Sequence, residues 1–502
     1  MLRRTLLKSL AASAALPLVL RHGTAFAAAP DVLDVAIVSD PVTLDPALMA
    51  SFFELSVQYN LHEPLLHVTP DLAIEPGLAE LSAPDDTTYV LTLKDGLTFH
   101  DGTAIDAEAV KANFDRMLDP ATGSPRRSEL GPIASVEASG PLEVTIKLSA
   151  PYAPFAGVLA NRAGMMVSPK AVADLGADFA TKAVGSGPYK LVSWNKNSEL
   201  VLEAFDGYWR GKPAIGRVVF HPISDETVRM TNLRSGTVQL ADGVAPQLVS
   251  QVEQASDLTM KQRPGLGFNA FSFNNTRAPF DKAAVRQAFV TAVGPQVIQR
   301  AVYFGTGSVS NGPVPPSIAW AYDETLDPAR GDAEKAKSIL SEAGISDPVE
   351  VSVTVTNSPL QVRTAEIIQA QAGQAGFKVS INQIDPTSLI TVLRQKDFDL
   401  CMSPWSGRSD PDGNMFNYFT KDGPNNFAGY QSDAVDGLLK KARTTLDQDE
   451  RATLYKQAQE TIAEDAPMLF LTFPSTLQAS VAKLDWMQWP DGALRLQFAK
   501  FS

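Results

Sequence analysis

Cysteine is almost absent from this sequence, which holds Cys401 alone. No disulfide can form within the chain, so its fold must depend on hydrophobic cores. Histidine is also rare, and the five histidines show neither HxH nor HxxxH spacing, so no Cys/His metal site is expected. Neither a GxSxG elbow nor a GxxxxGK phosphate loop occurs. The sequence therefore predicts no metal and no cofactor.

Positive charge is in the minority, since 43 Lys and Arg stand against 56 Asp and Glu, for a net charge of −13. Nucleic acids and anionic membranes both require a basic face, so neither is expected as the main partner. After the N-terminus no apolar run reaches about 18 residues, so no integral membrane segment is expected. A length of 502 residues allows more than one core.

The first 29 residues have the pattern of an export signal. Arg3, Arg4 and Lys8 are followed by an uncharged apolar run at residues 9–20, which is too short to span a bilayer. Small residues then allow cleavage near Ala27 to Ala29, and the pattern predicts a secretory signal peptide. The paired arginines also fit a twin-arginine signal, so both export routes stay open.

Strand and helix patterns alternate regularly in the second half of the chain. Residues 349–355, 378–384 and 398–402 are typical of strands, and helical patterns lie between them. This β-α-β-α-β order predicts a parallel sheet, whose ligands bind beyond the carboxyl ends of the strands. Earlier in the chain, residues 47–60 predict a helix.

The loop that follows the third of these strands is the candidate ligand-binding loop. It carries Trp405, Arg408, Ser409, Asp410 and Asp412. The Trp either packs beneath the loop or forms an aromatic platform, and the Arg either faces solvent or binds an anion. The two acids are either turn formers or a carboxylate pair of a secreted hydrolase. These alternatives stay open on the residues alone.

Eight segments carry a family resemblance. The most specific is residues 91–118, LTLKDGLTFHDGTAIDAEAVKANFDRML. The others follow in order at residues 185–194, 205–213, 229–240, 279–289, 333–344, 405–414 and 429–442. With these motifs the chain resembles family 5 of the extracellular solute-binding proteins of ABC importers, which carry oligopeptides, dipeptides, glutathione, nickel chelates or opines.

The resemblance implies an α/β fold of the two-lobed periplasmic binding protein type (large cluster C), with an extra subdomain on the first lobe. Lobe I would comprise residues 31–50, 181–263 and 472–502, the subdomain residues 51–180, and lobe II residues 264–471. A ligand would bind between lobes that close over it. The resemblance also implies a periplasmic monomer that delivers a small molecule to an inner-membrane ABC permease and catalyses no reaction.

One departure from the family pattern concerns the ligand. In the family's peptide binders an Asp three residues after the Trp pairs with the peptide's amino terminus, and this chain has Arg408 at that position. A guanidinium repels an ammonium, so we expect a solute with an anionic group near Trp405. Met49 and Phe52 are expected on the opposite wall, and Arg127 as a second clamp. The alternative is an oligopeptide carrier that uses backbone contacts, with Arg408 turned to solvent.

Overall fold

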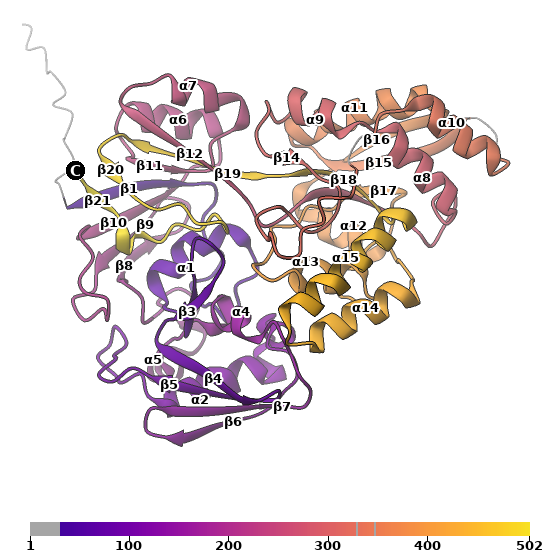
Figure 1. Cartoon of the computed structure of the whole chain (residues 1–502). Coiled ribbons are helices and arrows are strands. Elements are labelled where there is room, and N and C mark those ends of the chain that lie inside the picture. Colours follow the sequence, from indigo (N-terminus) through magenta and orange to yellow (C-terminus); the bar gives the residue numbers. More distant parts are fainter. Residues whose placement is uncertain (1–30, 328–329, 346–347) are drawn as a thin grey trace, which may run out of the picture.

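The computed structural model describes residues 31–327, 330–345 and 348–502. The expected signal peptide lies outside the described residues. Three main sheets organise the fold, and Figure 1 shows them as three separate units. No helix in the described ranges is long and apolar enough to cross a membrane.

The first lobe is built on a seven-stranded sheet with the order β12-β19-β11-β1-β10-β9-β8. Its central strand β1 pairs in parallel with β10 and β11, and the remaining pairs are antiparallel. The strands are β1 (Val32–Ile37), β8 (Tyr189–Asn195), β9 (Glu199–Ala204), β10 (Arg217–Pro222), β11 (Leu240–Asp242), β12 (Leu258–Pro264) and β19 (Ser475–Val481). The helices of this lobe are α1 (Leu55–Leu61), α5 (Pro169–Leu175), α6 (Glu226–Arg234) and α7 (Val249–Glu253).

The second lobe is built on a six-stranded sheet with the order β14-β18-β13-β17-β15-β16. Its strands are β13 (Asn269–Phe273), β14 (Ser308–Val309), β15 (Val349–Thr356), β16 (Phe377–Ile384), β17 (Leu400–Met402) and β18 (Met468–Phe473). Its helices are α8 (Ala283–Ala292), α9 (Pro295–Ala301), α10 (Ala333–Glu342), α11 (Pro359–Gln374), α12 (Leu389–Gln395), α13 (Asp412–Phe419), α14 (Asp433–Thr444) and α15 (Gln448–Asp465).

The predicted β-α-β-α-β unit is confirmed in this lobe. Strand β15 pairs in parallel with β16 on one side and with β17 on the other, and α11 and α12 make the crossovers. Alternating Val351, Val353 and Val355 are buried, as expected for an interior strand with a neighbour on each side. The loop after β17 therefore leaves the sheet at the carboxyl end of a parallel strand.

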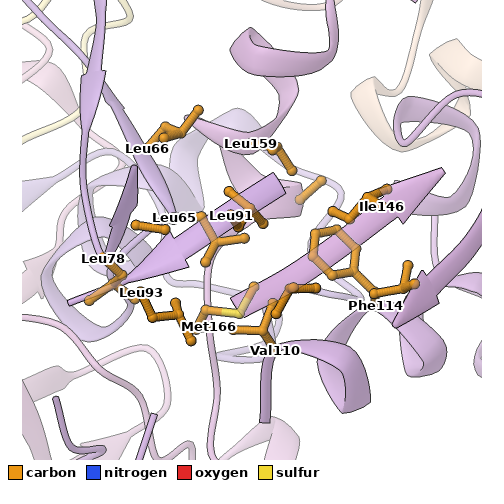
Figure 2. Packing of buried hydrophobic residues seen from close by; sticks show 14 of the residues in the cluster. Leu65, Leu66, Leu78, Leu91, Leu93, Val110, Phe114, Ile146, Leu159 and Met166 are labelled. Atoms are coloured by element: carbon orange, nitrogen blue, oxygen red, sulfur yellow. The ribbon is translucent and has the colours of Figure 1, made fainter. Parts of the chain in front are cut away.

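The subdomain holds a four-stranded antiparallel sheet with the order β4-β5-β7-β6, covered by α2 (Ala107–Leu118). Its strands are β4 (Ala79–Asp85), β5 (Thr88–Leu93), β6 (Ile133–Gly140) and β7 (Glu143–Leu148), and its smaller elements are β2 (Leu66–Val68), β3 (Ile74–Pro76), α3 (Arg126–Glu129) and α4 (Phe155–Leu159). Asp106 caps α2 by accepting a hydrogen bond from the Ala109 N–H. Val110 and Phe114 then pack on Leu91 and Ile146 of the sheet (Figure 2).

Some residues of the predicted subdomain range, 51–180, pack in the core of the first lobe. Val57 and Leu61 of α1, with Ala171 and Phe179, belong to the core of the first lobe. Leu65 is already part of the subdomain core. The reason is that α1 and α5 turn their apolar faces toward the seven-stranded sheet.

The helix expected at residues 47–60 begins later than predicted. The structure has a short 3-10 turn at Phe52–Glu54 that continues into α1. Ser51 accepts a hydrogen bond from the Phe53 N–H, and the Glu54 carboxylate accepts one from the Ser51 N–H. This reciprocal capping box ends the extended segment and fixes where the helix can start.

Two neighbouring chain segments join the lobes. One leads from β12 to β13 and the other from β18 to β19, and the Gly265 N–H of the first donates to the Pro474 oxygen of the second at 3.0 Å. A side chain at Gly265 would approach that oxygen to 2.8 Å, so only glycine allows this close approach. Figure 1 shows both connections between the sheets.

His100 in the subdomain should make the free energy of unfolding depend on pH. Its Nδ1 accepts a hydrogen bond from the Gly185 N–H and its Nε2 lies 3.0 Å from the Gly187 oxygen, an arrangement that fits only a neutral ring. Burial lowers the pKa of His100 to about 4, and burial lowers the pKa of His62 to about 4 as well.

The unfolded chain protonates these rings near pH 6.5, before the folded chain does. The free energy of unfolding should therefore fall as the pH decreases from about 6.5 to 4. His100→Gln, whose amide can keep both hydrogen bonds, should reduce this loss by roughly 1 kcal/mol in denaturant titrations across that range. Identical pH profiles for the variant and the wild type would contradict the assignment.

Candidate functional site

Two cavities lie at the boundaries between the units. The first, called the hinge-side cavity, has a volume of about 330 Å³ and is lined by both connecting segments, by Phe52 and Phe53, and by residues 242–244 and 490–493. The second, called the subdomain cavity, has a volume of about 280 Å³ and lies between the subdomain and the second lobe. Its walls come from residues 125–129, from residues 154–161 and from the loop that carries Trp405 and Arg408.

The candidate loop is fixed directly to one of the connecting segments. Trp405 and Phe268 exchange two backbone hydrogen bonds, at 2.9 and 3.0 Å. Gly267 permits this contact because a Cβ there would lie 1.8 Å from the Trp405 oxygen, and Gly407 adopts a φ of +82° beside Leu266. The position of the loop is therefore tied to the hinge rather than left to solvent.

Trp405 lies half-buried on the wall of the subdomain cavity. Its indole N–H donates to Asn414 Oδ1 at 3.0 Å, and its ring meets Tyr418 edge-on at 5.3 Å between centroids. The guanidinium of Arg408 lies 4.6 Å above the centroid of the Trp405 ring. Asn414 Oδ1 also accepts the Arg408 backbone N–H, so this buried amide orients both residues. The indole of Trp405 thus packs against Tyr418 and also lines the subdomain cavity.

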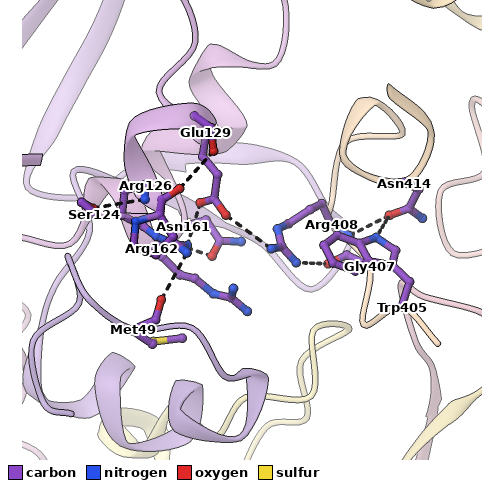
Figure 3. Close-up of polar contacts among 12 residues, drawn as sticks. Met49, Ser124, Arg126, Glu129, Asn161, Arg162, Trp405, Gly407, Arg408 and Asn414 are labelled. Carbon is purple, nitrogen blue, oxygen red and sulfur yellow. Dashed lines mark hydrogen bonds and ion pairs between the residues drawn. The ribbon is translucent and has the colours of Figure 1, made fainter. Parts of the chain in front are cut away.

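Arginines from two units surround one carboxylate in this cavity (Figure 3). Glu129 accepts from Arg126 at 2.7 Å and from Arg408 at 3.5 Å, the latter across the gap between subdomain and second lobe. Arg162 lies in the same cluster, and its Nε is buried with no hydrogen-bond partner among the described residues. We call Arg126, Arg162 and Arg408 the arginine cluster.

The charges of the arginine cluster are only partly balanced. Burial and the nearby Arg408 together lower the pKa of Arg162 to about 9, while Glu129 acts in the opposite direction. Burial raises the pKa of Glu129, but Arg126, Arg408 and Arg162 outweigh that effect and hold it below its ordinary value. At neutral pH three guanidinium groups therefore act electrostatically on one carboxylate, which leaves an excess of positive charge in the arginine cluster.

The two loop acids are already paired with arginines of the second lobe. Arg451 Nη2 lies 2.8 and 3.0 Å from the carboxylate oxygens of Asp410. Arg443 binds both oxygens of Asp412 at 2.9 and 2.7 Å. Each acid thus stabilises the start of α13 against α14 or α15.

In the described part of the chain, no three His, Cys, Asp or Glu side chains come together as a metal site.

The remaining residues expected at the site lie in different places. Phe52 lines the hinge-side cavity, and Ser409 lines the subdomain cavity. The Met49 side chain is fully buried against Leu55 and Tyr59, so it faces neither cavity, although its backbone oxygen accepts a hydrogen bond from Arg126. Arg127 is exposed, and it is the neighbouring Arg126 that lines the subdomain cavity.

Sequence reasoning missed Glu129 and Arg162. Glu129 could have been predicted as a partner of Arg126, because it follows that residue by three positions and such pairs meet on a helix. No sequence pattern pointed to Arg162, since it reaches the cluster only through the folding of the subdomain. Asn414 was also missed, although it lies next to the DPDG turn.

The chain matches known proteins over most of its length. Residues 73–427 match the family described as bacterial extracellular solute-binding proteins, family 5 Middle. The glutathione-binding protein GsiB of Salmonella paratyphi A is 30% identical over 466 residues, which cover 90% of each chain. GsiB of Escherichia coli shows the same identity and coverage.

Solved structures give the same result. The periplasmic binding protein DppA from Helicobacter pylori, in complex with peptide STSA, superposes with a TM-score of 0.83 at 26% identity and covers 94% of this chain and 98% of DppA. NikA from Staphylococcus aureus, with Ni(L-His)2, superposes with a TM-score of 0.81 at 22% identity, over 94% of this chain and 100% of NikA. The matches in sequence and in fold agree, and the chain belongs to family 5 of the bacterial extracellular solute-binding proteins.

Proposed function

We propose that this family member is a periplasmic receptor that captures a small solute with an anionic group and delivers it to an inner-membrane ABC permease, without catalysing a reaction. A monomer is sufficient for this role, because both walls of each cavity come from one chain. The observation that carries the proposal is the excess positive charge of the arginine cluster beside Trp405. A carboxylate is the simplest group that would balance this charge.

The energetics favour an anion at this point. A buried charge without a partner is costly, and the cost falls when a group of opposite charge enters. Planar guanidinium groups suit carboxylates because two parallel N–H donors match two oxygens. Since the chain as a whole is acidic, with a net charge of −13, this local charge must provide the attraction.

An ammonium is disfavoured at the same point. Arg408 occupies the position at which peptide binders of the family hold an Asp, and Asp410 is held by Arg451. A plain peptide with its amino terminus beside Trp405 would thus face a guanidinium. Glutathione, which names the GsiB relatives, carries two carboxylates and belongs to the proposed chemical class.

Contacts between the subdomain and the second lobe support closure of these two units over the ligand. Arg408 of the second lobe meets Glu129 of the subdomain, and the Ala153 N–H donates to the Arg443 oxygen at 2.9 Å. A ligand carboxylate at Arg408 would compete with Glu129 and would itself join the two units. Ligand binding and closure are therefore coupled through the same guanidinium.

The two alternatives have less support. An oligopeptide carrier with Arg408 in solvent does not fit an Arg408 side chain that is 20% exposed and whose guanidinium packs on Trp405. A hydrolase that uses Asp410 or Asp412 would need carboxylates free to react, and both are held in ion pairs. The matches to binding proteins also favour a receptor over an enzyme.

Removing the Arg408 guanidinium should weaken binding of the natural ligand. Native mass spectrometry of protein exported to the periplasm would first identify the ligand by mass. Arg408→Ala should then lower its affinity about 10- to 100-fold in calorimetric titrations, because a charged hydrogen bond contributes about 1.5–3 kcal/mol. Arg127→Ala, which removes an exposed charge nearby, is the matched control and should change affinity less than about twofold. An effect of Arg408→Ala within twofold would remove the anion site.

Removing the Asp410 charge should lower the stability of the protein and should not affect a catalytic activity. Asp410→Asn leaves the buried Arg451 without its partner, which should cost roughly 2–4 kcal/mol in denaturant-induced unfolding. Asp422→Asn, at an exposed acid of the same lobe, is the control and should lie within about 0.5 kcal/mol of wild type. Conversion of a bound compound by the wild type, abolished in Asp410→Asn, would instead favour the hydrolase.

A further inference from the structure

A second charged group faces the hinge-side cavity at the end of strand β11. The Asp242 carboxylate lies on the cavity wall and accepts hydrogen bonds from Ser56 Oγ at 2.8 Å and from Gln478 Nε2 at 2.7 Å. Both donors are neutral. They orient the carboxylate, but they do not compensate its charge.

Asp242 differs in this respect from the other acids of the two cavities. Asp491 forms a two-point ion pair with Arg495, and Asp410, Asp412 and Glu129 also have arginine partners. Among the described residues no cationic nitrogen lies within 4 Å of the Asp242 carboxylate. Arg229 is close enough to act on it electrostatically, but its guanidinium donates to the oxygens of Ile223, Ser224 and Gly243.

The surroundings make this charge costly. Burial raises the pKa of Asp242, although the hydrogen bonds from Gln478 and Ser56 and the charge of Arg229 act in the opposite direction. The same cavity is also lined by Phe52, Phe53, Tyr303 and Leu266. Aromatic faces attract cations, and an apolar wall strengthens the attraction between a cation and a carboxylate.

We propose that Asp242 binds a cationic group of the ligand, an ammonium or a guanidinium, inside the hinge-side cavity. This inference deepens the proposed function and rests on it, because it concerns the same solute held between the lobes. Together with the arginine cluster it defines the ligand class as a dipolar solute with an apolar body. Its positive end lies near the hinge, and its negative end lies beside Trp405.

A third, smaller cavity shares residues with both. Its volume is about 10 Å³, and it shares Leu266 and Asp491 with the hinge-side cavity and Asn161 and Ser409 with the subdomain cavity. This volume holds at most about one water molecule. Both lobes contribute to its lining, so a ligand that spans the two cavities requires the lobes to separate before it binds.

Small probes of opposite charge test the two subsites separately. Ligand-free full-length receptor is titrated with benzylammonium, with benzyl alcohol as its uncharged counterpart, and with benzoate. We expect benzylammonium to bind at about 1 mM or below and to raise the melting temperature more than benzyl alcohol does. Asp242→Asn should lower the affinity for benzylammonium at least about tenfold and leave the weak response to benzyl alcohol unchanged.

The control is Asp257→Asn, which removes the same charge from an exposed position of the first lobe and should bind benzylammonium like the wild type. If Asp242→Asn does not fold, Asp242→Ser removes the same charge with a smaller side chain and replaces it in the titration. The inference is overturned if the wild type does not distinguish benzylammonium from benzyl alcohol, or if both Asp242 variants retain that distinction.

The benzoate titration separates this inference from the proposed function. Benzoate binding should be lost in Arg408→Gln and retained in Asp242→Asn. If benzoate fails to bind while benzylammonium binds through Asp242, the anion site fails and the cation site stands. The opposite pattern refutes the cation site and leaves the anion site intact.

Discussion

The two backbone hydrogen bonds between Trp405 and Phe268 are the contact on which the rest of the site depends. They attach the ligand loop to a segment that connects the lobes, at a place where Gly267 and Gly407 allow the two backbones to touch. The attachment sets Trp405 on one cavity wall and directs Arg408 toward the subdomain. Any movement of this connecting segment would therefore displace the groups proposed to bind the ligand.

Charge is distributed unevenly over the two cavities. The subdomain cavity gathers an excess of guanidinium groups around Glu129, whereas the hinge-side cavity presents the Asp242 carboxylate with only neutral hydrogen-bond donors. Each cavity thus has a local excess of one charge, which a ligand group of the opposite charge would neutralise. The other acids of the cavities have buried or partly buried arginine partners, and their role is to hold the loop and the C-terminal segment in place.

The sequence predicted the parts of the fold whose patterns are local. The alternating valines of β15 have the period of a strand, and the structure has a strand there. Strand β12 was not predicted, because its apolar alternation covers only Leu258 and Met260 and is followed by Lys261, Gln262 and Arg263. It is a strand only because it pairs along β19 at the edge of the sheet.

The site was predictable to a similar degree. The carboxyl end of β17 located the loop of Trp405 and Arg408, since parallel sheets expose that edge. The partners of these residues were not predictable, because Glu129 lies 279 positions from Arg408 and Gln478 lies 236 positions from Asp242. Only the fold brings such groups together, which is also why Arg126 rather than the exposed Arg127 lines the cavity.

A crystal structure of the protein with its co-purified ligand would show directly which ligand group lies at Arg408. We expect an anionic group of the ligand within hydrogen-bond distance, about 2.7–3.2 Å, of the Arg408 guanidinium beside the Trp405 ring. An ammonium of the ligand at that place, or an Arg408 side chain turned to solvent in the closed complex, would contradict this expectation.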